Sequence, residues 1–122
     1  MYAPIFEVCS SDTSIQSLLG DGPTLRLYPF GQALQDEKRP YAVWRTIYGS
    51  PENYLGTPSD CDSWGLLVDV YARTATSARE VAAALFAVIE LHAYITEYNG
   101  EARDPETQDY RYSFTVDWIK IR

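Results

Sequence analysis

The chain has 122 residues, of which 46% are hydrophobic and 22% are charged, values that fit one folded domain with a single apolar core. This composition excludes a disordered tail and a membrane-spanning helix. The formal net charge of −7 argues against a protein that binds nucleic acid by neutralising phosphates over its whole surface.

The start of the chain has no basic stretch and no long apolar run. We therefore expect neither a secretory signal nor a membrane anchor, and a protein that stays in the cytoplasm where it is made. The two cysteines, Cys9 and Cys61, are expected to be reduced structural thiols rather than a disulfide framework.

The first 20 residues predict a helix. Pro4 suits its first turn because the missing N–H has no partner to lose there, and Gly20 stands where helices commonly end. Three apolar residues share one helical face: Ile15, Leu18 and Leu19. Since Asp12 is suited to cap a new helical segment, we predict a helix that is broken near Asp12 and ends at Gly20.

Five segments rich in β-branched and aromatic residues predict strands: 24–28, 41–48, 64–73, 94–98 and 110–118. Between the second and third strands, residues 49–60 predict a long loop that projects from the sheet if these strands form a hairpin. Asn99 and Gly100 predict a turn before the last strand.

The alanine-rich run 81–91 predicts the main helix, with Ser77 and Glu80 at the spacing of a capping box. The order of elements is therefore helix, three strands, helix, two strands. We predict an α/β (α+β) fold with a single mixed or antiparallel sheet of four to five strands. Two helices pack on one face of that sheet, in one domain that covers residues 1–122.

Alternation along the strands predicts two unlike sheet faces. The helix-covered face is expected to carry nine residues: Tyr41, Val43, Ile47, Leu66, Val68, Val70, Tyr112, Phe114 and Val116. The opposite face is expected to mix apolar and polar residues: Trp44, Tyr48, Leu67, Tyr71 and Ile119 with Thr46, Asp69, Arg73, Thr115 and Asp117. Mixed aromatic and polar surfaces commonly contact another protein chain. The alternative is that these residues are scattered surface side chains, or that the long loop covers them.

The sequence contains no pattern typical of a catalytic, cofactor or metal site. His92 is the single histidine and has no neighbouring metal ligand, and the glycines near residue 20 lack the Lys of a phosphate-binding loop. We expect no enzymatic activity, no cofactor and no bound metal. A different class of function remains as an alternative, in which Cys61, His92 and nearby acids form a small enzyme or ligand-binding site.

The chain resembles the tail-completion family, the small tail-terminator proteins of long-tailed bacteriophages. Five segments carry the resemblance, in order along nearly the whole chain: Leu27-Tyr28-Pro29, Pro40-Tyr41-Ala42-Val43, Val68-Asp69-Val70-Tyr71-Ala72, the helix at 77–91 and the aromatic strand at 110–118.

The resemblance implies a structural virion protein. It would form a hexameric ring at the tail–neck junction, end polymerisation of the tail tube and present the surface that joins the head. Its partners would be further copies of itself, the tail tube protein and a neck or head-completion protein, with DNA only passing through the channel and no membrane contact. It would assemble in the host cytoplasm. Another neck or head-completion connector is the alternative within the same particle.

Six residues are predicted to make these contacts. Trp44, Tyr48, Tyr71 and Arg73 are expected at subunit contacts, and Tyr54 and Leu55 in the long loop at a tail or neck contact. Net negative charge would suit a channel through which DNA slides without sticking.

Overall fold

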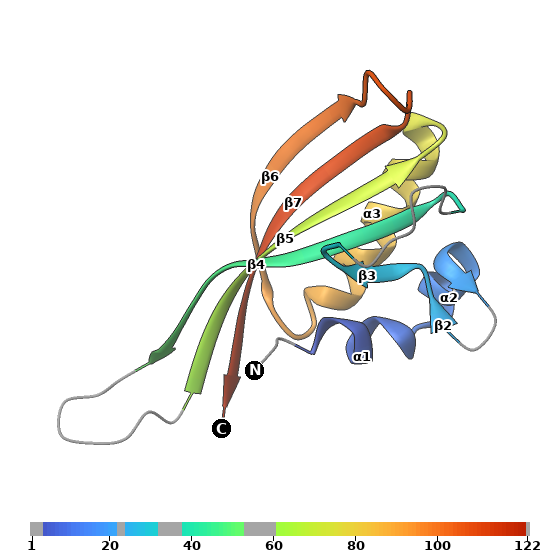
Figure 1. The fold of residues 1–122 in the computed structure, drawn as a ribbon. Coiled ribbons are helices and arrows are strands. Elements are labelled where there is room, and N and C mark those ends of the chain that lie inside the picture. Colours follow the sequence, from blue (N-terminus) through green and yellow to red (C-terminus); the bar gives the residue numbers. More distant parts are fainter. Residues whose placement is uncertain (1–3, 22–23, 32–37, 53–60, 122) are drawn as a thin grey trace, which may run out of the picture.

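A computed structural model describes residues 4–21, 24–31, 38–52 and 61–121 (Figure 1). Its main sheet has five strands in the order β3-β4-β5-β7-β6. These are β3 (Leu27–Pro29), β4 (Tyr41–Glu52), β5 (Cys61–Ala72), β7 (Tyr110–Ile121) and β6 (Tyr94–Arg103). β3 pairs with β4 in parallel and the other neighbours are antiparallel. The predicted mixed sheet and the α+β class are confirmed.

The N-terminal helix is broken where the sequence predicts it. α1 (Ile5–Ser10) and α2 (Thr13–Leu19) are separated at Asp12. The Asp12 carboxylate accepts a hydrogen bond of 3.0 Å from the Ile15 N–H, which satisfies one of the free donors at the start of α2. The helix ends at Gly20, as predicted.

The predicted strand at 24–28 is divided in two at Arg26. β2 (Thr24–Leu25) pairs only with β1 (Gly20–Asp21), whereas β3 joins the main sheet. Arg26 is buried, and its guanidinium donates to the carbonyls of Leu18, Gly20 and Pro40 at 2.8 to 3.1 Å. This side chain therefore ties α2 to the segment before β4 at the point where the strand is interrupted.

The main helix, α3 (Ala75–Ile89), begins earlier than the predicted capping box at Ser77. Thr74 caps it, because its hydroxyl accepts a hydrogen bond of 3.1 Å from the Ser77 N–H. Ser77 therefore belongs to the first turn. The buried side of α3 carries Val81, Leu85 and Ile89.

The predicted turn at Asn99 and Gly100 is wrong, because β6 continues through both residues to Arg103. Gly100 has a φ of 101° and lies at a shift in the β6–β7 register, so it forms a bulge instead. The turn comes at residues 104–109, where the Asp104 N–H donates to the Asp109 carbonyl at 2.8 Å. The Asp104 carboxylate also accepts from the Glu106 N–H at 2.8 Å.

The face assignment of β5 and β7 is confirmed. Five of the residues predicted beneath the helices are fully buried in one core with residues of α1, α2 and α3: Leu66, Val68, Val70, Phe114 and Val116.

The face assignment is reversed in the first part of β4, before its bulge. Ala42 pairs with Val70 and Trp44 with Val68, so Ala42 and Trp44 lie on the helix side. Tyr41 and Val43 lie on the other side, opposite Tyr71 and Asp69, contrary to the prediction. Residues 41–44 are all apolar, so alternation alone could not choose the side. A bulge between Thr46 and Tyr48 then leaves Ile47, predicted to be in the core, exposed.

Candidate interaction surface

One side of the main sheet carries no helix from the described part of the chain, and we call it the open face (Figure 1). The strand register places eleven residues there: Tyr41, Val43, Arg45, Tyr48, Leu67, Asp69, Tyr71, Arg111, Ser113, Thr115 and Asp117. Because residues alternate between faces, those of β5 and β7 alternate with helix-side residues of the same strand.

Side-chain hydrogen bonds join the strands across the open face. The Ser113 hydroxyl on β7 donates to the Asp69 carboxylate on β5. The Thr115 hydroxyl donates to the side-chain oxygen of Asn99 on β6 at 2.8 Å. These bonds fix polar groups on a surface that receives no packing from a helix, so the open face is ordered before any partner arrives.

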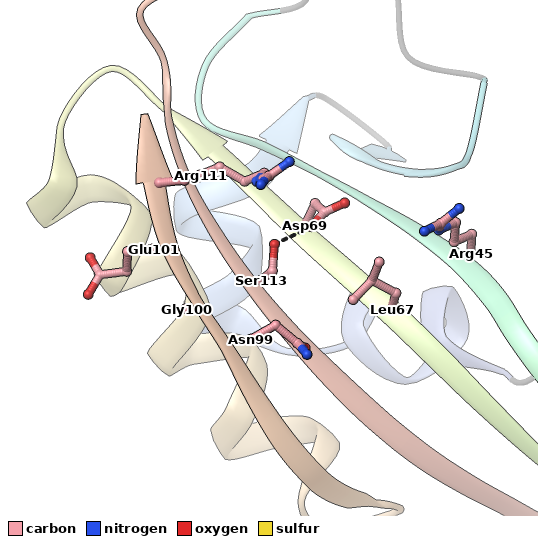
Figure 2. Close-up of a pocket in the computed structure, with 9 residues that line it drawn as sticks. Arg45, Leu67, Asp69, Asn99, Gly100, Glu101, Arg111 and Ser113 are labelled. Atoms are coloured by element: carbon pink, nitrogen blue, oxygen red, sulfur yellow. Dashed lines mark hydrogen bonds between the residues drawn. The ribbon is translucent and has the colours of Figure 1, made fainter. Parts of the chain in front are cut away.

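A shallow depression of about 340 Å³ lies on this face, between β5 and the middle of β6 (Figure 2). Its lining includes Asp69 and Ser113, the small residue Gly100, and the cationic side chains of Arg45 and Arg111. Both signs of charge therefore meet around it. This chemistry fits polar and charged side chains of a protein partner.

Tyr71, one of the predicted contact residues, stacks on Tyr41 with ring centroids 5.1 Å apart. Burial raises the pKa of Tyr71, and the nearby charge of Asp69 raises it further, whereas a hydrogen bond with Arg111 lowers it. The Tyr71 hydroxyl thus stays protonated at neutral pH. Arg73 follows directly after β5 and is exposed.

Tyr48, a second predicted contact residue, belongs to the outer strand β4, and its side chain reaches across the open face to β7. Its hydroxyl donates to the Asp117 carboxylate on β7 at 3.1 Å. Its ring covers Gly65 so closely that a Cβ at position 65 would overlap it. Partial desolvation, and then its hydrogen bond with Asp117 and the charge of Asp117, raise the pKa of Tyr48. Sequence analysis missed this arrangement, although a glycine inside a strand is a signal of close approach.

Trp44 lies on the other face from Tyr48 and Tyr71. It is partly buried and packs against the core on the helix side. The four predicted subunit-contact residues therefore do not share one surface. The predicted loop contacts, Tyr54 and Leu55, fall outside the described residues, and all six contact roles stay predictions.

The cysteines and the histidine do not form a described site. Cys9 is buried in α1, and burial followed by the charge of Asp12 raises its pKa to about 12, so it is a neutral thiol. His92 is exposed beyond the end of α3, and Cys61 begins β5. Within the described ranges, no three His, Cys, Asp or Glu residues group as metal ligands. None of the helices in those ranges has the length and hydropathy needed to cross a bilayer.

Comparison with known proteins identifies the family of this chain. No curated protein matches the chain. A family model described as "Tail completion protein gp17" matches residues 3–120, which is nearly the whole sequence. The match covers the three helices and all of the main sheet except its last residue, Ile121. The resemblance noted from the sequence is thereby confirmed, and the chain belongs to the phage tail completion protein family.

Proposed function

We propose that this phage tail structural protein is a tail terminator. Six copies would form a ring on the end of the tail tube, stop its polymerisation and present the surface that joins a neck or head-completion protein. DNA would only pass through the channel, at the tail–neck junction of the virion. The observation that carries the proposal is the family match over residues 3–120.

The shape of the sheet supports a connecting role. β4, β5 and β7 each have 12 residues and would span about 40 Å if straight, against about 22 Å for α3. The strands therefore continue beyond the helices as an arm (Figure 1). We define the distal arm by the backbone of residues 49–52, 61–62 and 119–121. An arm without helices offers both of its faces to another component.

We assign the distal arm to the tail or neck contact. In the sequence, the predicted contact residues Tyr54 and Leu55 stand between β4 and β5, two of the three strands of this arm. On the body of the protein, Tyr48, Tyr71 and Arg73 remain proposed subunit contacts. Trp44 could take part only at the margin of the helix side, because it packs against the core.

Mixing experiments test the terminator role. Purified protein is added to growing tail tubes, and separately to tail tubes and to filled heads, and bound mass and tube length are measured. A terminator shortens the growing tubes and binds their ends as a hexamer. Binding to heads alone would instead identify a neck or head-completion connector, and binding to neither would overturn both.

A double variant and a control test whether the distal arm makes the tail or neck contact. Tyr54→Ser combined with Leu55→Ser should reduce binding to tubes or necks while the free energy of unfolding stays unchanged. The control is Ala83→Ser, an exposed position on α3 far from the arm in the sequence. If the double variant caps tubes as well as the control does, the contact lies elsewhere.

A further inference from the structure

The exposed large hydrophobic residues gather at the two edges of the main sheet. Of the seven found among the described residues, six lie at an edge, each with 45% to 78% of its surface exposed. Ile47 and Tyr48 belong to the edge strand β4, and Phe30 directly follows β3 beside it. Tyr94 and Tyr98 belong to the edge strand β6, and Leu91 lies in the turn that leads into it. Apolar groups at two opposite edges indicate two contact surfaces rather than one.

Both edges lack a strand partner in the described part of the chain. β3 pairs with β4 only as far as Trp44, so β4 is the outer strand from Arg45 onward. β6 is the outer strand on the other side, from Tyr94 to Arg103. We call the first surface the β4 edge (Phe30, Arg45, Ile47, Tyr48) and the second the β6 edge (Leu91, Tyr94, Glu97, Tyr98).

Bulges interrupt both edges. The register of β4 shifts between Thr46 and Tyr48, and that of β6 shifts twice, after Ile95 and after Tyr98. A bulge bends the strand and leaves a residue out of the ladder, which opposes continuous backbone pairing with a new strand. Contacts at these edges must therefore rely on side chains.

The first part of β4 and the start of β6 carry charges of opposite sign, while the acid Glu52, at the end of β4, belongs to the distal arm. Residues 38–48 contain three bases, Lys38, Arg39 and Arg45, and no acid. Residues 90–101 contain three acids, Glu90, Glu97 and Glu101, and no Lys or Arg. Two of these charged residues already form ion pairs within the chain, Arg39 with Asp109 and Glu101 with Arg79. Arg45, Glu90 and Glu97 are exposed.

The charges favour one way of joining two copies. Contact between two β6 edges would bring Glu97 near a second Glu97, whereas contact between unlike edges brings Arg45 near Glu97. The open-face sides of the two edges also match, because Arg45 and Tyr48 lie there on β4 and the register places Tyr94 and Glu97 opposite Asp117 and Thr115 on β6. Arg103, the base of β6, lies at its far end over the Tyr110 ring.

We propose that the β4 edge of one copy docks against the β6 edge of a second copy of this chain. The inference rests on the proposed ring and names its contact surfaces. Because the two surfaces differ and lie on opposite sides of the sheet, each copy uses one for each neighbour, and a closed ring leaves neither free. A side-chain contact between bulged edges sets an angle between neighbours instead of extending one sheet.

A charge exchange tests the pairing. Arg45→Glu alone and Glu97→Arg alone should each weaken association at least about tenfold, because each places like charges together. The chain that carries both changes should associate nearly as the wild type does, since every contact again has one base and one acid. The readout is mass by analytical ultracentrifugation, with and without tail tube protein. A double variant as weak as the singles would overturn the pairing.

Complementation between two blocked copies gives the sharper result. Ile47→Asp blocks the β4 edge and Tyr94→Asp blocks the β6 edge, so each variant alone should remain a monomer. Their mixture has one intact pair of edges and should stop at a dimer. Rings formed by either variant alone would refute the inference. Unfolding in urea checks that both variants fold, which their exposed positions favour.

These experiments can distinguish a failure of the edge contact from a failure of the proposed terminator role. If the wild type forms rings and caps tubes while all of these variants do so equally well, the terminator role stands and the edge contact is wrong. If the wild type neither associates nor caps tubes at any concentration tested, the terminator role itself fails, and the edge contact fails with it.

Discussion

The two faces of the main sheet are built from alternate residues of the same strands but are held together in different ways. On the helix side, Phe114 is fully buried and the centroid of its ring lies 4.7 Å from that of the Phe86 ring on α3. Next to it on the open face, Thr115 is also buried but is held by its hydrogen bond to Asn99. Apolar packing stabilises the fold on one side, and hydrogen bonds fix the positions of polar side chains on the other.

Truncating the packed side should have the largest effect. Phe114→Ala removes a fully buried ring and leaves a cavity beneath α3, so we expect the free energy of unfolding to fall by about 4 kcal/mol. Thr115→Val, its neighbour on the open face, keeps the volume and loses one hydrogen bond, at a cost of about 1 kcal/mol. Urea unfolding measures both. Equal losses in the free energy of unfolding would show that the two faces do not differ in how they stabilise the fold.

A buried ion pair at the end of the sheet comes next. Arg39, just before β4, donates to Asp109, just before β7, at 2.7 Å, and their side chains are 10% and 2% exposed. Arg39→Ala leaves the buried carboxylate without this partner and should cost about 3 kcal/mol. The double variant Arg39→Met with Asp109→Leu should recover most of that loss. A double variant as unstable as the single one would show that the pair has a role beyond mutual neutralisation.

How far the sequence predicted the fold depended on whether a local signal was present. The break at Asp12, the five strands and the main helix follow from capping chemistry and from residue preferences, which act over a few neighbours. Such local signals do not decide which β4 side chains point toward the helices, because an apolar run from Tyr41 to Trp44 suits either face. Its side is decided by the small Ala42 beneath the helices and by the bulge that follows.

The candidate surface was predicted in part for the same reason. Tyr48 and Tyr71 were assigned to the open face, where they lie, but Trp44 was placed with them and packs on the other side. The β6 edge was not predicted as a surface, because the strand order that makes β6 an outer strand has no local signal in the sequence. The strand itself was ended five residues early, because a turn was expected at Gly100. A glycine in a bulge and a glycine in a turn have the same local signature, a positive φ.

Displacing a side chain on the open face should affect association more than folding. In Gly65→Ala, the added methyl pushes the Tyr48 ring away and breaks its bond to Asp117, which should lower the free energy of unfolding by about 1 kcal/mol. Association should fall much further, because the ring leaves the β4 edge. The control is Tyr48→Phe, which keeps the ring in place without the bond. If both variants associate equally well, Tyr48 is not positioned by Gly65.

The smallest effect is expected at an exposed ion pair between α3 and β6. Arg79 donates to both oxygens of the Glu101 carboxylate at 2.9 and 3.1 Å, with side chains 63% and 41% exposed. In both pairs two guanidinium nitrogens donate to the carboxylate, although those of Arg39 share one oxygen of Asp109. Water already solvates both of its charges, however, and ordering two long side chains opposes the attraction. Glu101→Gln should therefore leave the urea midpoint unchanged within error at 0.15 M salt. A loss as large as that of Arg39→Ala would mean that burial is not what separates the two pairs.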